Sequence, residues 1–76
     1  MNDLYYCRVA VPETDGSEEQ RARAFALAKD HAIGQVKLTL KKAGAGEWER
    51  GHHRVTMSMD STLERDTVIA EWWPYE

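Results

Sequence analysis

The chain has 76 residues, of which 42% are hydrophobic, and its 13 acidic and 10 basic side chains leave a formal net charge of −3. This length holds one domain with one small core, and the negative charge argues against general nucleic-acid affinity. The single cysteine excludes an intrachain disulfide framework and favours a reducing, cytoplasmic compartment. No apolar run approaches the roughly 20 residues of a membrane span, and the first residues lack the pattern of a secretion signal.

The first predicted element is a strand over residues 4–11, because apolar side chains alternate along one of its faces. These side chains are Tyr5, Cys7, Val9 and Val11. Pro12 ends the strand, since proline has no N–H to donate. Cys7 is interpreted as a small buried hydrophobe rather than a reactive thiol, because nothing in the sequence near it would activate the sulfur.

A helix is predicted to begin after Ser17, which can form a capping box with Gln20. Good helix formers fill residues 21–33, and Gly34 is predicted to end the helix in the left-handed conformation. One face at helical spacing is predicted to be buried. Its members are Ala22, Phe25, Ala26, Ala32 and Ile33.

Alternation returns after Gly34 and predicts a second strand over residues 35–42. Its apolar face consists of Val36, Leu38 and Leu40, and its wet face of Lys37, Thr39 and Lys41. Residues 43–46 are then predicted to form a glycine-rich turn.

A third strand is predicted within residues 48–59 and is clearest at Val55, Met57 and Met59. The β-branched and aromatic run over 67–73 predicts a fourth strand. A short helix over 61–73 is the alternative, because Ser61 and Glu64 also fit a capping box.

These elements predict one α+β domain over residues 1–76, in the order β-α-β-β-β. Its architecture is a two-layer sandwich with one helix on a three- or four-stranded, mainly antiparallel sheet. No spacing in the sequence indicates a cofactor, a metal site or catalytic residues, so we do not predict an enzyme. In a regular strand, the adjacent pair His52 and His53 point to opposite faces and cannot chelate one ion together.

The C-terminal aromatic residues are the most informative feature for function. If Trp72 and Trp73 lie in a strand, they face opposite sides of a sheet that the helix covers on one side only. One tryptophan is therefore predicted to lie in the core and the other on the uncovered side, where Tyr6 and Trp48 could join it. Exposed tryptophan and tyrosine, including Tyr75, are typical of binding interfaces.

Charged residues are segregated along the chain. One acidic cluster comprises Glu13, Asp15, Glu18 and Glu19, and another comprises Asp60, Glu64 and Asp66. Basic residues lie between them, and Lys37, Lys41 and Arg54 are predicted to share a strand face. That face supports an alternative hypothesis, a small nucleic-acid-binding or regulatory domain.

In size, in its acidic clusters, in its helix after the first strand and in its aromatic tail, the chain resembles small phage-encoded anti-CRISPR proteins directed at type I complexes. The resemblance implies a cofactor-free inhibitor in the host-cell cytoplasm. It also implies that an acidic surface occupies a basic DNA-binding groove on a CRISPR effector subunit, where carboxylates can pair with Lys and Arg.

Our hypothesis from the sequence is therefore a non-catalytic, protein-binding inhibitor, monomeric or homodimeric, that contacts neither membrane nor nucleic acid directly. An oligomeric accessory subunit is the other alternative. The candidate partner-binding residues are Glu13, Asp15, Glu18, Glu19, Asp60, Glu64, Asp66, Trp72, Trp73 and Tyr75.

Overall fold

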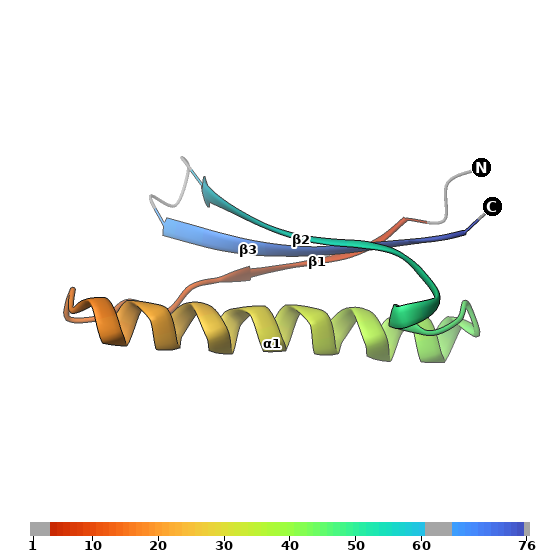
Figure 1. Cartoon of the computed structure of the whole chain (residues 1–76), viewed down its shortest axis with the longest axis horizontal. Coiled ribbons are helices and arrows are strands. Elements are labelled where there is room, and N and C mark those ends of the chain that lie inside the picture. Colours follow the sequence, from red (N-terminus) through yellow and green to blue (C-terminus); the bar gives the residue numbers. More distant parts are fainter. Residues whose placement is uncertain (1–3, 61–64, 76) are drawn as a thin grey trace.

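The computed structural model describes residues 4–60 and 65–75. Strand β1 (Tyr5–Ala10) precedes helix α1 (Glu18–Ala43), and a short 3₁₀ turn, η1 (Trp48–Arg50), leads into strands β2 (Gly51–Asp60) and β3 (Arg65–Pro74). The strands form one antiparallel sheet in the order β1-β3-β2, and α1 lies along one face of it (Figure 1). The predicted α+β sandwich is confirmed, with one strand fewer than the β-α-β-β-β order.

The missing strand is residues 35–42, which continue the helix, so both the predicted strand and the predicted stop at Gly34 are wrong. The apolar alternation over Val36, Leu38 and Leu40 was misleading. Two of these residues continue a row of buried positions four residues apart: Ala24, Ala28, Ala32, Val36 and Leu40. The lysines and leucines of this segment are good helix formers, so burial of the row and local propensity both favour helix.

Both ends of α1 carry the expected type of cap. The N-terminal cap is at the predicted residue, Ser17, whereas the C-terminal glycine cap is Gly44, ten residues after the predicted Gly34. The Ser17 hydroxyl accepts a hydrogen bond from the Gln20 N–H at 3.2 Å, and the first-turn glutamates suit the positive end of the helix dipole. At the other end, Gly44 is left-handed with φ of 64°. Its N–H donates to Lys41 and the Ala45 N–H donates to Leu40, which is the Schellman arrangement.

Gly34 offers a direct test of this helix. A Cβ added there would meet nothing within 4 Å, and the residue lies on an exposed part of the helix surface. We expect Gly34→Ala to raise the free energy of unfolding by about 0.5–1 kcal/mol, because alanine is the better helix former. Urea denaturation in dilute solution would measure this. A helix that ended at Gly34 in the left-handed conformation would instead be destabilised by the substitution.

The core lies between the buried row of α1 and the inner face of the sheet. A step of four residues slightly exceeds one helical turn, so the row winds slowly round the helix as it crosses the strands. Its first three members are alanines, which allow close approach to the sheet. The bulk is concentrated at the C-terminal end of α1, where Val36, Leu40 and Trp72 are the largest fully buried side chains. The predicted buried face was only partly right, since Ala22 and Ala26 are exposed.

The remaining strand predictions are confirmed. Residues 65–74 form a strand rather than a helix, whereas the expected capping box of Ser61 and Glu64 lies outside the described residues. Along β1, Tyr5, Cys7 and Val9 are half-buried towards α1, in the predicted alternation. Gly51 begins β2 directly after η1.

The molecule is elongated, with principal dimensions of 42 × 23 × 18 Å. A 26-residue helix spans about 39 Å by itself, so α1 sets the length. The start of α1 and the start of β3 lie at one end, and the chain's C-terminal segment lies at the other (Figure 1). Binding features at the two ends therefore belong to different surfaces.

Candidate functional site

The sheet has one face turned away from α1, which we call the open face (Figure 1). Side-chain alternation and strand register define it, because residues directly opposite each other in neighbouring strands share a face. The open face includes Tyr6, Arg8, Ala10, His52, Arg54, Thr56, Ser58, Thr67, Ile69, Glu71 and Trp73. Aromatic and charged side chains predominate on it, and Tyr6 is 63% exposed.

An aromatic cluster occupies the open face near the C-terminal end of β3. His52 lies directly opposite Trp73 in the register, and their rings stack with centroids 5.7 Å apart. The Tyr75 ring lies edge-on to the His52 ring, with the two centroids 4.9 Å apart. Tyr75 is exposed and Trp73 is half-buried. The three rings therefore present a preformed apolar patch with polar edges, which is the composition of an interface hot spot.

Arg54 joins this cluster to the middle of the sheet. Its Nε and Nη2 atoms both donate to one oxygen of Glu71, at 3.2 and 3.0 Å. The guanidinium carbon also lies 6.0 Å from the centroid of the Trp73 ring, within cation–π range. The Arg54 side chain therefore contacts both neighbours, while 60% of it remains exposed.

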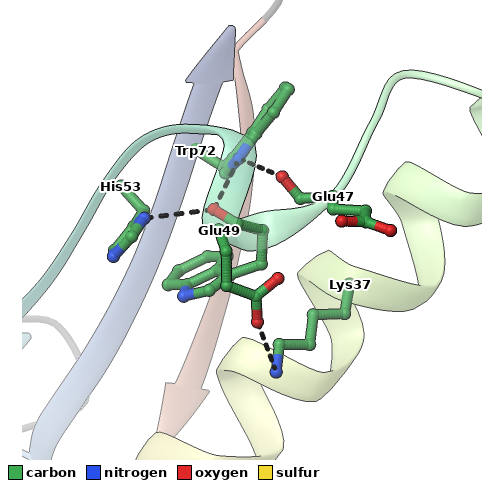
Figure 2. A network of polar contacts seen from close by, with 6 residues as sticks. Lys37, Glu47, Glu49, His53 and Trp72 are labelled. Carbon is green, nitrogen blue, oxygen red and sulfur yellow. Dashed lines mark hydrogen bonds and ion pairs between the residues drawn. The ribbon is translucent and has the colours of Figure 1, made fainter.

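Trp72 has the opposite role from Trp73, as the sequence predicted for one member of the pair. It is 1% exposed, and its Nε1–H donates to the backbone carbonyls of Glu47 and Trp48, at 3.2 and 3.1 Å (Figure 2). The Trp48 carbonyl is also 3.1 Å from Nδ1 of His53. These contacts tie η1 to β3 and fix the end of the sheet that carries the aromatic cluster.

Trp48 does not lie on the open face, contrary to the expectation that it could join Tyr6 there. It is buried on the helix side, and its ring stacks on His53 at 4.6 Å. The two adjacent histidines do face opposite sides of the sheet, as predicted, and each stacks on a tryptophan. Lys37 also approaches Glu49 of η1 at 3.8 Å, a contact that links the helix to the turn (Figure 2).

The predicted acidic residues that the structure describes lie away from the aromatic cluster, at the end of the molecule where α1 begins. The first acidic cluster, Glu13, Asp15, Glu18 and Glu19, is exposed there. A hydrogen bond from the Val11 N–H to the Asp66 carbonyl, at 2.9 Å, brings exposed Asp66 to the same end. The side chain of Asp60 and all of Glu64 lie outside the described part of the chain.

Local structure accounts for part of this acidic cluster. Asp15 Oδ1 accepts the Ser17 N–H at 2.9 Å, and Glu19 pairs with Arg23 at 3.6 Å. Arg21 and Arg65 line a depression of about 190 Å³ beside Glu13 and Asp66. Both signs of charge are therefore present at this end.

The predicted basic strand face does not exist. Lys37 and Lys41 lie on α1, whereas Arg54 lies on the open face of β2, so the three cations do not share a surface. The prediction of this face was wrong because residues 35–42, which were expected to form a strand, belong to α1. The site members absent from the predicted partner-binding residues are His52 and Arg54. Their alternation with half-buried Val55 was visible in the sequence, but their partners in β3 were not.

A second depression of about 390 Å³ lies between α1 and β2, lined by Phe25, Ala26, Lys29, Val55, Thr56, Met57 and Val68. Its lining is mostly apolar, and Lys29 is its one titratable group. Among the described side chains, no three His, Cys, Asp or Glu residues come together as metal ligands. In residues 4–60 and 65–75, no helix has both the length and the apolar character that a membrane crossing needs.

Comparisons of the chain with protein-family models, with curated proteins and with solved structures find no match.

Proposed function

We propose that the protein is a non-catalytic binding domain that docks a protein partner through the open face of its sheet. The observation that carries this proposal is the preformed cluster of Trp73, His52, Tyr75 and Arg54 on a face without a covering layer. Aromatic side chains and arginine dominate the binding energy of protein interfaces when they are rigid and central. An inhibitor that works by occupying a partner's surface needs no further machinery.

A protein partner suits this face better than a nucleic acid. The charge of Arg54 is already balanced by Glu71, and the ring of His52 already stacks on one face of the Trp73 ring. Base stacking needs free ring faces, and phosphate binding needs unpaired cations. The charges and rings of the cluster satisfy one another, which favours an apolar, shape-complementary surface as the partner.

The test compares substitutions on opposite faces of the sheet, where Tyr6 is 63% exposed on one face and Met57 is 60% exposed on the other. Protein captured from the native host by the wild-type domain would be purified and its Kd measured. We expect Tyr6→Ala combined with Trp73→Ala to weaken binding by roughly a hundredfold, as for the loss of hot-spot residues. Met57→Ala is the matched control and should leave the Kd unchanged. Equal affinities for the open-face variant and wild type would refute docking through this face.

A second candidate function is the DNA-mimic inhibitor implied by the anti-CRISPR resemblance. The observation that favours it is the placement of Asp66 at the same end as Glu13, Asp15, Glu18 and Glu19. Together they form an acidic surface at one end of an elongated domain. Such a surface could enter a groove lined by Lys and Arg.

Charge reversal tests this second candidate. Glu13, Asp15, Glu18 and Glu19 would all be changed to lysine, and inhibition of duplex binding by a type I CRISPR complex would be measured by gel shift. Loss of inhibition is expected, together with a strong salt dependence in the wild type. Reversal of Glu47 and Glu49, at the other end, is the control. Wild-type protein that never displaces DNA contradicts the candidate, whatever the reversed variant does.

A further inference from the structure

The exposed surface of α1 carries a stripe of four residues at spacings of four, three and four. These are Leu27, His31, Gly34 and Leu38, and we call them the outer stripe. The spacing is that of one seam of a helix pair. Leu27 is 61% exposed and Leu38 is 46% exposed, and neither leucine belongs to the core cluster. These exposed leucines are therefore not explained by packing within one chain.

Gly34, in the middle of the outer stripe, also lacks a role within one chain. It lies inside a helix, where glycine is about 1 kcal/mol less favourable than alanine. An added Cβ would meet no atom within 4 Å, and no positive φ requires glycine there. Glycine on a helix surface allows close approach of another backbone or a large side chain. Its position between two exposed leucines points to a second helix that lies across this surface.

The spacing of the outer stripe is the same in both directions along the helix. A two-fold axis between residues 32 and 33 therefore places Leu27 opposite Leu38 of a second copy. The same axis places His31 opposite Gly34 of that copy, so that a large ring faces the space left by a missing side chain. We propose that two copies of this chain associate through their outer stripes, with the two α1 helices antiparallel.

Charges beside the outer stripe support a second copy as the occupant. Asp30 and Lys37 lie on the same flank of the stripe, both exposed, and Lys37 also lies 3.8 Å from Glu49 of its own chain. In an antiparallel pair, each flank meets the same flank of the other helix, so Asp30 comes near Lys37 of the second copy, twice by symmetry. At the ends, Lys41 of one copy comes near Arg23 of the other, where Glu19 already pairs with Arg23 at 3.6 Å. The central pairs are therefore attractive, and the outer pair of cations is partly neutralised.

This contact is distinct from the proposed docking face, because the outer stripe belongs to α1, which covers the other face of the sheet (Figure 1). Two paired helices would leave both open faces directed outward, so one dimer could bind two partner surfaces. A single helix pair is a small interface, and we expect reversible association rather than an obligate dimer.

The experiment measures the dimer dissociation constant of the full chain by sedimentation equilibrium, with the protein itself as the only component. The wild type should show a concentration-dependent monomer–dimer equilibrium. Leu27→Ser combined with Leu38→Ser is expected to weaken association by roughly a hundredfold. Met57→Ser removes an equally exposed apolar side chain elsewhere, and it should leave association unchanged. Far-UV circular dichroism confirms that each variant remains folded.

Charge exchange provides a second, independent arm of the test. Asp30→Lys and Lys37→Asp should each weaken association by roughly tenfold, and the double exchange should restore it. Gly34→Ala should weaken association while it stabilises the helix. A wild type that stays monomeric at the highest soluble concentration overturns the proposal. A dimer that survives the leucine changes but is lost in Trp73→Ala also overturns it, because the contact would then be through the open face.

Discussion

Trp72→Ala is expected to remove a large part of the protein's unfolding free energy at 25 °C. The substitution removes the largest fully buried side chain, and replacing a buried tryptophan by alanine costs roughly 3–5 kcal/mol. A domain of this length has only about 4–11 kcal/mol of stability in total. The variant also leaves the carbonyls of Glu47 and Trp48 without their indole donor. Urea denaturation followed by circular dichroism should show a large loss of the unfolding free energy.

The neighbouring residue provides the control for this prediction. Trp73→Ala removes a side chain of the same size from the open face, and we expect it to change the unfolding free energy by only about 1 kcal/mol, from lost ring contacts. Trp72→Phe, which keeps an aromatic ring but loses the N–H, should fall between the two alanine variants. Equal losses at the two positions would contradict the assignment of one tryptophan to the core and the other to the binding face.

The second large effect is expected for Gly51→Ala. An added Cβ at Gly51 would collide with the indole atoms of Trp72. The backbone at Gly51 is extended, with φ of −162°, and any residue can adopt this conformation. The damage therefore comes from overpacking, which costs about 1–3 kcal/mol in well-packed cores. We expect thermal unfolding of Gly51→Ala at a clearly lower temperature, because Trp72 is held by the 3₁₀ turn and cannot move aside freely.

A double-mutant cycle isolates this collision. Gly51→Ala should be less damaging in a Trp72→Phe background, because the phenyl ring leaves out the indole atoms that the new methyl would meet. Gly34→Ala, which faces open space, serves as the opposite control and should stabilise the protein. If the effects of Gly51→Ala and Trp72→Phe simply add, the contact between the two side chains does not explain the need for glycine.

Local signals predicted several parts of the fold well. The Ser17 cap, the alternation in β1 and the aromatic run of β3 each describe an element through interactions between residues close in the sequence. The segment over residues 35–42 was different, because its apolar residues fit both strand alternation and one helical row. The contacts of Val36 and Leu40 with a sheet formed by distant residues decide between them, and these contacts are not visible locally.

In the candidate site, too, some features follow from neighbouring residues and others from contacts between distant residues. The adjacent tryptophans indicated that one would be buried and one would face outward, since neighbouring strand residues point in opposite directions. Which of the two is buried depends on whether α1 covers the face of Ala70 or that of Glu71. His52 and Arg54 enter the site because the register of β2 against β3 places them opposite Trp73 and Glu71.

Trp72 and Trp73 illustrate which features of this protein follow from its sequence and which from its tertiary structure. The sequence alone determined a small acidic domain of one helix and an antiparallel sheet, with a C-terminal strand that has one core tryptophan and one outward tryptophan. Alternation and capping are local, so they are readable from neighbouring residues. The tertiary structure alone decided the helix length, the buried tryptophan and the separation of the aromatic cluster from the acidic end. Those features depend on which distant residues pack together, and packing is a property of the whole chain.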